Sequence, residues 1–104
     1  MKKMIAGLVC ASLVAAWAGS AAGADANNGE VLARHWCASC HVVSADQQRG
    51  STSAAPFSEI AKKPGLDAAK LALFLLLPHP RMPDMNLSRA EAADLAAYIE
   101  TQGK

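Results

Sequence analysis

The chain has 104 residues, about half of them hydrophobic, and its ten Lys and Arg against nine Asp and Glu give a formal net charge of +1. This length limits the molecule to one small domain. The balanced charge, without a basic run, gives no reason to expect nucleic acid or an anionic membrane surface as a partner.

Residues 1–24 have the features of a secretory signal peptide. Two lysines precede an apolar run over residues 4–18, and the small residues before position 25 suit a peptidase that cuts after Ala24. The run is shorter than the ~20 residues that span a bilayer. We therefore expect export and cleavage rather than a retained membrane anchor, with residues 25–104 as the mature domain.

The first half of this domain predicts one helix, a long loop and a short helical turn. Asn27 can cap a helix that runs into Cys37. Residues 42–56 are mostly small and polar, which is typical of a loop. A loop of that length in a small domain usually has a function. Residues 57–63 then predict a helical turn that stops at Pro64.

The second half predicts two more helices, joined by a stiff loop. Asp67 is placed to cap the apolar segment AAKLALFLLL, which we expect to form core and which ends at Pro78. Three prolines in PHPRMPDMN exclude regular structure there. Ser88 and Glu91 form a capping-box pattern before the last helix. Three apolar residues then share one face of that helix: Leu95, Tyr98 and Ile99.

The segment RHWCASCHVV contains Cys37 and Cys40, with His41 directly after the second cysteine. Thiol–disulfide exchange, structural zinc and covalent haem all use such a pair. A redox dithiol normally follows a strand at a helix start, whereas these cysteines end a helix and no strand pattern surrounds them. Zinc needs four ligands, and the other usual soft ligands of the mature chain are only His35 and His79.

Covalent haem agrees with all of these features. Thioether bonds from Cys37 and Cys40 would hold the porphyrin, and His41 would lie beneath the iron. A chain this small buries a modest fraction of its surface and usually needs a disulfide, metal or cofactor to be stable. Haem would supply that apolar surface, and its attachment after export agrees with the signal peptide.

The mature chain resembles the class I c-type cytochromes over nearly its whole length. Gly29 stands where the family places a glycine between its first and last helices, and CASCH is the haem motif. APFSEIA resembles the segment whose proline carbonyl accepts a hydrogen bond from the proximal histidine. RMPDMNLSRAEAADLAAYI resembles the distal-ligand loop and the C-terminal helix. The resemblance implies an all-α class I cytochrome c fold, with short helices wrapped around one covalently attached haem.

The resemblance also implies a role for each site residue: Cys37 and Cys40 for the thioethers, His41 and Met82 as axial ligands of the haem iron, and Pro56 for the carbonyl that orients His41. Met85 and His79 are alternatives for the distal position, and an open iron is another. Leu95 and Tyr98 would pack against the first helix and the haem. Ala33 stands where the family often has a large aromatic residue. Trp36 is a candidate to compensate for it, or to contact a partner.

The function that the resemblance implies is the transfer of single electrons between periplasmic redox proteins, such as a dehydrogenase or a terminal oxidase. We expect a monomer without membrane insertion, and a carrier rather than an enzyme. One alternative is the electron-accepting haem subunit of a dehydrogenase. A peroxidase or a gas sensor would need an open sixth position on the iron, and the sequence has no convincing distal His and Arg pair for a peroxidase.

Overall fold

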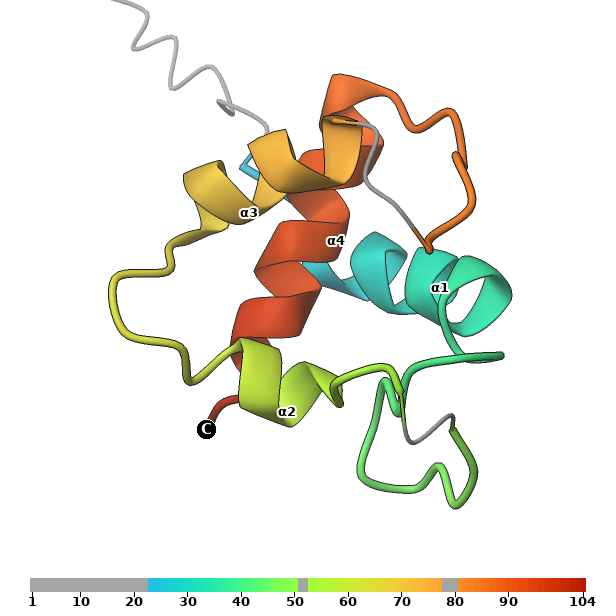
Figure 1. Ribbon diagram of the computed structural model, residues 1–104. Coiled ribbons are helices and arrows are strands. Elements are labelled where there is room, and N and C mark those ends of the chain that lie inside the picture. Colours follow the sequence, from blue (N-terminus) through green and yellow to red (C-terminus); the bar gives the residue numbers. More distant parts are fainter. Residues whose placement is uncertain (1–22, 51–52, 78–80) are drawn as a thin grey trace, which may run out of the picture.

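The computed structural model describes residues 23–50, 53–77 and 81–104. These residues contain helices and no strand, which agrees with the predicted all-α class (Figure 1). None of their helices combines the length and hydropathy needed to cross a membrane. The helices are α1 (Ala26–Trp36), α2 (Phe57–Ile60), α3 (Ala68–Leu76) and α4 (Arg89–Thr101).

Asp25 caps the start of α1. Its carboxylate accepts hydrogen bonds from the backbone N–H groups of Asn27, at 2.9 Å, and Asn28, at 3.2 Å. The expectation that Asn27 would be the cap is therefore wrong. The reason is that Asn27 already lies inside the first turn, where its N–H is one of the donors that a cap must satisfy.

The caps of α3 and α4 agree with the sequence. The Asp67 side chain accepts from the backbone N–H of Lys70 at 2.8 Å. Both bonds of the capping box are present at α4, where the Glu91 N–H donates to Ser88 Oγ at 3.0 Å and the Ser88 N–H donates to Glu91 Oε1 at 2.9 Å. The turn after residue 56 is helical only over α2, which is shorter than predicted.

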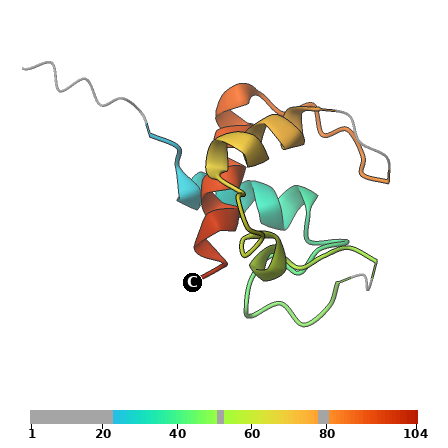
Figure 2. The ribbon, with the colours of Figure 1, turned by 60° about the vertical axis from the view of Figure 1, so that its left-hand side comes forward.

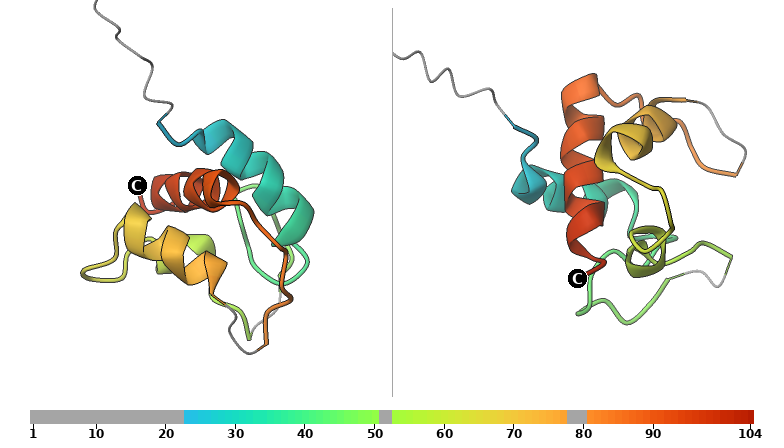
Figure 3. Two further views of the ribbon diagram at one scale, coloured as in Figure 1. Left: turned by 90° about the horizontal axis from the view of Figure 1, so that it is seen from above. Right: turned by 90° about the vertical axis from the view of Figure 1, so that its left-hand side faces the viewer.

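Helices α1 and α4 cross in close contact, as the view from above shows (Figure 3). A Cβ atom on Gly29 would lie 2.0 Å from the backbone oxygen of Asp94 and 2.8 Å from the Cβ of Tyr98. Only glycine fits this crossing, as the family resemblance implied. The Asp94 carboxylate adds two bonds, accepting from the Asp25 N–H at 2.7 Å and from Asn28 Nδ2 at 2.9 Å.

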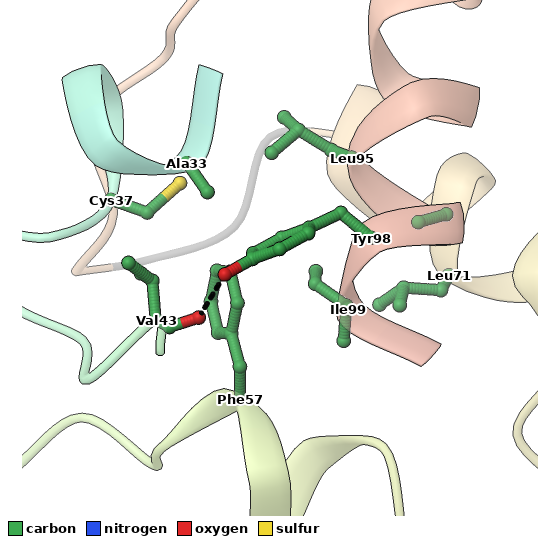
Figure 4. Close-up of a cluster of buried hydrophobic side chains, with 9 residues drawn as sticks. Ala33, Cys37, Val43, Phe57, Leu71, Leu95, Tyr98 and Ile99 are labelled. Carbon is green, nitrogen blue, oxygen red and sulfur yellow. Dashed lines mark hydrogen bonds between the residues drawn. The ribbon is translucent and has the colours of Figure 1, made fainter. Parts of the chain in front are cut away.

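The core lies on the inner face of α4 (Figure 4). Leu95, Tyr98 and Ile99 are all buried there, as their spacing predicted. The Tyr98 hydroxyl donates to the backbone oxygen of Val43 at 2.7 Å, which ties α4 to the loop after the cysteine pair. The other buried members of the cluster are Ala33, Cys37, Val43, Phe57, Leu71 and Ala96.

Trp36 does not compensate for the small residue at position 33. Ala33 is fully buried, whereas Trp36 is 46% exposed at the end of α1. The Trp36 ring lies edge-on to His35, with 4.6 Å between ring centroids. Because Trp36 is outside the buried cluster, the space at the crossing is filled by the close approach of the two helices.

Helix α3 is only partly core, although its sequence is apolar all round. Leu71 is buried and Phe74 borders the cavity described below, but Leu73 and the C-cap residue Leu77 are each more than half exposed. The prediction that the whole segment LALFLLL is core, facing haem and the C-terminal helix, is therefore wrong for Leu73 and Leu77. A single-layer contact with α4 can cover only one side of a helix.

Candidate cofactor site

A cavity of about 350 Å³ lies between the end of α1, helices α2 and α3, and the segment before α4. Its volume falls within the range of small-molecule sites. The loop after α1 and the segment before α4 extend on the same side of α4 (Figure 2). Apolar side chains form most of the wall, among them Phe57, Ile60, Leu71, Phe74, Leu95 and Ile99.

The cysteine pair forms a tight turn at the end of α1. The Cys37 N–H still donates to the helix, at 2.9 Å from the Ala33 oxygen, and the Cys37 oxygen then accepts from the N–H groups of Cys40, at 3.1 Å, and His41, at 2.8 Å. Cys37 is buried and borders the large cavity, while Cys40 is exposed and borders an adjoining hollow of about 150 Å³. The turn therefore brings the three motif residues together.

The environment of the cysteines disfavours redox and zinc chemistry. Burial raises the pKa of the Cys37 thiol to about 11, whereas a reactive dithiol needs a lowered thiol pKa. Among the residues that the structure describes, no group of three or more His, Cys, Asp and Glu side chains could hold a metal ion. His79, one of the possible zinc ligands, lies outside the described residues.

His41 is held in place through one ring nitrogen. Its Nδ1 lies 2.6 Å from the backbone oxygen of Ala55. A carbonyl oxygen can only accept, so Nδ1 carries the hydrogen and donates it. In the neutral ring, Nε2 then has the lone pair that a metal requires. Because His41 borders the large cavity, this arrangement suits a proximal iron ligand.

The carbonyl that orients His41 is not that of Pro56, so this part of the prediction is wrong. Pro56 is the N-cap of α2, and its oxygen accepts from the N–H groups of Glu59, at 3.0 Å, and Ile60, at 3.1 Å. The Ala55 carbonyl points instead toward His41. Pro56 acts one position away, because a proline restricts the residue before it to extended conformations.

Met82 borders the large cavity, together with His41. It also borders the hollow next to Cys40 and a second small hollow beside residues 75–77. Met85 borders only the two smaller hollows. Arg81 has a φ of 74°, which turns the chain sharply just before Met82. His79 is outside the described residues. Of the two methionines, Met82 is better placed for the distal position, because it borders the cavity that His41 also borders.

Gln47, which no sequence pattern indicated, ties together the loop after the cysteine pair. Its Oε1 accepts from the Val43 N–H at 2.9 Å, and its Nε2 lies 2.9 Å from the Ala38 oxygen, 2.8 Å from the His41 oxygen and 2.6 Å from the Arg49 oxygen. His41 is thus held by its ring and by its own carbonyl. Nothing in the local sequence distinguishes Gln47 from the glutamine that follows it.

Comparison with known proteins agrees with this site. The family model for cytochrome c matches residues 26–103. The chain belongs to the cytochrome c family. It is 48% identical over 93 residues to cytochrome c-552 of Bradyrhizobium diazoefficiens, a match that covers 89% of each chain. No solved structure gives a significant match.

Family membership confirms the c-type resemblance, the all-α cytochrome c fold and haem c as the cofactor. It also makes the chain a c-type electron carrier with one haem motif. The described residues fit the cofactor. An apolar cavity is bordered by a buried cysteine, by a histidine with one ring nitrogen anchored, and by a methionine sulfur. Imidazole and methionine thioether are donors that haem iron takes in cytochromes c, while the cysteine is placed to bond the porphyrin.

Proposed function

We propose that the protein carries single electrons between periplasmic redox proteins, with one haem attached to Cys37 and Cys40. His41 and Met82 would be the axial ligands of its iron. One observation supports the proposal most strongly: His41 and Met82 border the same apolar cavity as Cys37. In this function no substrate is transformed, so the protein is a carrier and not an enzyme.

When bound, haem supplies the iron that gains and loses one electron. The residues of the chain keep the surroundings of the iron constant while the iron changes its oxidation state. The Ala55 carbonyl, by accepting from His41 Nδ1, fixes the ring and raises its basicity as a ligand. A methionine thioether favours the ferrous state and raises the reduction potential. Apolar walls, including Phe57 and Leu95, exclude water from the iron.

The proposed partners are a protein donor and a protein acceptor, such as a dehydrogenase and a terminal oxidase. Residues 25–104 contain eight Lys and Arg and nine Asp and Glu, a formal charge of −1. This balance offers no strong field for nucleic acid or for an anionic membrane. We propose a monomer that meets its partners by brief collisions.

We also propose that the signal peptide is removed after Ala24. Asp25 caps α1 through its carboxylate, and its N–H lies 2.7 Å from Asp94 Oδ1. Cleavage would convert that N–H into an ammonium group, whose positive charge is unfavourable at a helix N-terminus. The negative charge of the Asp94 carboxylate beside it would offset this effect. Mass spectrometry of the exported protein tests the cleavage. Residues 25–104 with one haem are expected, and a chain that keeps Met1 contradicts it.

Met82→Ala tests the carrier function. A weak thioether bond to ferric iron depends on the loop that holds the methionine, so we expect the variant to lose the far-red methionine-to-iron charge-transfer band. It should also bind carbon monoxide or cyanide and have a lower reduction potential. Absorption spectroscopy and a redox titration of the purified holoprotein measure these changes.

Met85→Ala is the matched control for Met82→Ala and should change none of these properties, because Met85 does not border the large cavity. Loss of the band in Met85→Ala, with retention in Met82→Ala, would assign the distal ligand to Met85. Binding of carbon monoxide by the wild-type ferrous protein at neutral pH would contradict the carrier function, since an open iron is what a peroxidase or a gas sensor requires.

A further inference from the structure

Two lysines border the otherwise largely apolar cavity. Lys63 follows α2 and Lys70 lies in the first turn of α3, so they stand at the two ends of the connection between these helices. They are the basic residues among the described lining of the cavity, and both are exposed at its edge. Cations at the edge of an apolar site suit a ligand that has an apolar body and an anionic end.

Haem is such a ligand, and the attachment at the cysteines fixes which way it points. Its two thioether positions lie along one side of the macrocycle, and its two propionate carboxylates extend from the other side. Cys37 lies at the end of α1, whereas the connection between α2 and α3 lies on the far side of α4 in the view of Figure 1. A haem attached at the cysteines therefore directs its carboxylates toward this connection.

We propose that Lys63 and Lys70 bind the haem propionates, a role that rests on the proposed attachment at Cys37 and Cys40. Two ammonium groups match two carboxylates in charge. Lys70 is already directed to the connection, because its Nζ donates to the backbone oxygen of Gly65 at 3.0 Å. Because both lysines are exposed, ion pairs of this kind should weaken as the salt concentration rises.

The other charged groups nearby do not border the cavity. Glu100 and Lys104, from the end of α4, border a separate hollow beside Leu66. Glu59 of α2 borders another hollow on the side of Pro56, and the Asp67 carboxylate is bonded to the first turn of α3. The remaining titratable groups that line the cavity are Cys37, the proposed attachment site, and His41, the proposed iron ligand. Lys63 and Lys70 therefore dominate the charge at the propionate edge.

The proposal has a consequence for the reduction potential. An ionised carboxylate near the iron stabilises the ferric state, and a nearby ammonium group offsets that effect. An ammonium group also favours ionisation of the carboxylate, so that the carboxylate loses its proton at lower pH. Removing the lysines should lower the potential at neutral pH and move the pH-dependent step of the potential upward.

The experiment uses the holoprotein with Lys63→Gln, Lys70→Gln and the double substitution. Lys62→Gln is the matched control, because Lys62 is the exposed neighbour of Lys63 and does not border the cavity. The reduction potential is measured by spectroelectrochemistry from about pH 5 to about pH 9, a range that includes carboxylates whose pKa is raised above the ordinary value. We expect the double variant to have a lower potential at neutral pH. Its pH-dependent step should lie about one pH unit higher.

Lys62→Gln should reproduce the wild-type profile. The proposal is overturned if the double variant also has that profile, or if Lys62→Gln shifts it as much as Lys63→Gln does, because the effect would then be one of general surface charge. An unchanged methionine-to-iron band in each variant shows that the iron ligands are intact. A wild-type protein without covalent haem would contradict the proposed function itself, and that result is visible before any potential is measured.

Discussion

The two sides of α4 are packed in different ways. On one side α1 approaches so closely that Gly29 has no room for a Cβ atom, and protein atoms fill the contact completely. On the other side α3, α2 and the segment with Met82 surround a cavity of about 350 Å³. The protein completes its own core on the first side, while the second side has an apolar cavity that we expect the cofactor to fill.

The size of the cavity shows how much this difference matters. The cavity is open at one edge, so without apolar contents its walls would be in contact with water, at a cost of about 25 cal/mol per Å² of apolar surface left uncovered. The free energy of unfolding of a whole domain is only about 5–15 kcal/mol. We therefore expect that the helix crossing alone does not keep α2 and α3 in place, and that haem contributes to the fold as well as to the function.

The largest effect is expected from removing the cofactor. The double variant Cys37→Ala/Cys40→Ala cannot form thioether bonds, so we expect it to lose cooperative unfolding and to resemble a molten globule. Circular dichroism during thermal unfolding measures the cooperativity. Hydrogen exchange should show protection lost in α3 before it is lost at the crossing of α1 and α4, because α3 depends on the cavity contents and the close contact at the crossing does not.

Ser39→Ala is the control for this experiment, since it changes the turn between the cysteines and keeps both sulfurs. It should bind haem and unfold cooperatively. A haem-free double variant that melts in one sharp transition would show that the leucine-rich α3 and the crossing form a sufficient core by themselves. The cavity on one side of α4 would then have little effect on the free energy of unfolding.

A smaller effect, confined to the other side, is expected from Gly29→Ala. The new Cβ would lie 2.0 Å from the Asp94 oxygen, so the helices must separate, at a cost of about 3 kcal/mol in the free energy of unfolding. The haem spectrum should stay unchanged, because Gly29 does not border the cavity, which α1 meets only beyond its C-terminal end. Denaturant unfolding of the holoprotein, followed by circular dichroism, measures the loss.

Val31→Ala provides the comparison for that measurement, since Val31 lies on the same helix but is 65% exposed. Its effect should stay within about 0.5 kcal/mol. If Gly29→Ala were equally mild, the crossing would have more room than the distances allow, and the close contact would not be what stabilises this side.

The smallest effect concerns Tyr98, which connects the core to the loop after the cysteine pair. Tyr98→Phe leaves the Val43 oxygen without the donor now at 2.7 Å and should cost about 1 kcal/mol of unfolding free energy. Burial raises the pKa of Tyr98 above that of an exposed tyrosine. The wild-type protein should therefore keep its full excess of unfolding free energy over Tyr98→Phe below about pH 10. At higher pH this excess should decrease, because the phenol of Tyr98 loses its proton at lower pH in the unfolded chain than in the folded one. An advantage that does not depend on pH would assign the loss to packing alone.

The features that could be predicted from the sequence are those set by local patterns. Ser88 and Glu91 are three residues apart, which is the spacing of a capping box whatever the rest of the fold does. The turn from Cys37 to His41 is equally local, and its spacing alone limited the chemistry to three kinds. The glycine at position 29 was recognised because a family pattern supplied the reason for it.

The features that were missed depend on where neighbouring elements begin. The Ala55 carbonyl orients His41 because α2 starts at the next residue and uses the Pro56 carbonyl for its own first turn. A shift of one residue in the helix start would exchange the two roles. Asp25 replaced Asn27 as a cap for the same reason. The exposed face of α3 was missed because an apolar sequence does not reveal how many sides will be covered.

Gln47 makes the loop after the cysteine pair sensitive to deamidation. Its amide nitrogen lies within hydrogen-bond distance of three backbone oxygens, and its amide oxygen accepts from the Val43 N–H. Deamidation would replace that nitrogen by a carboxylate oxygen, which can only accept. The new oxygen would face three other oxygens, including that of His41. The backbone of the loop, including the His41 carbonyl, is therefore tied to one amide group, whereas the His41 ring keeps its own bond to the Ala55 oxygen.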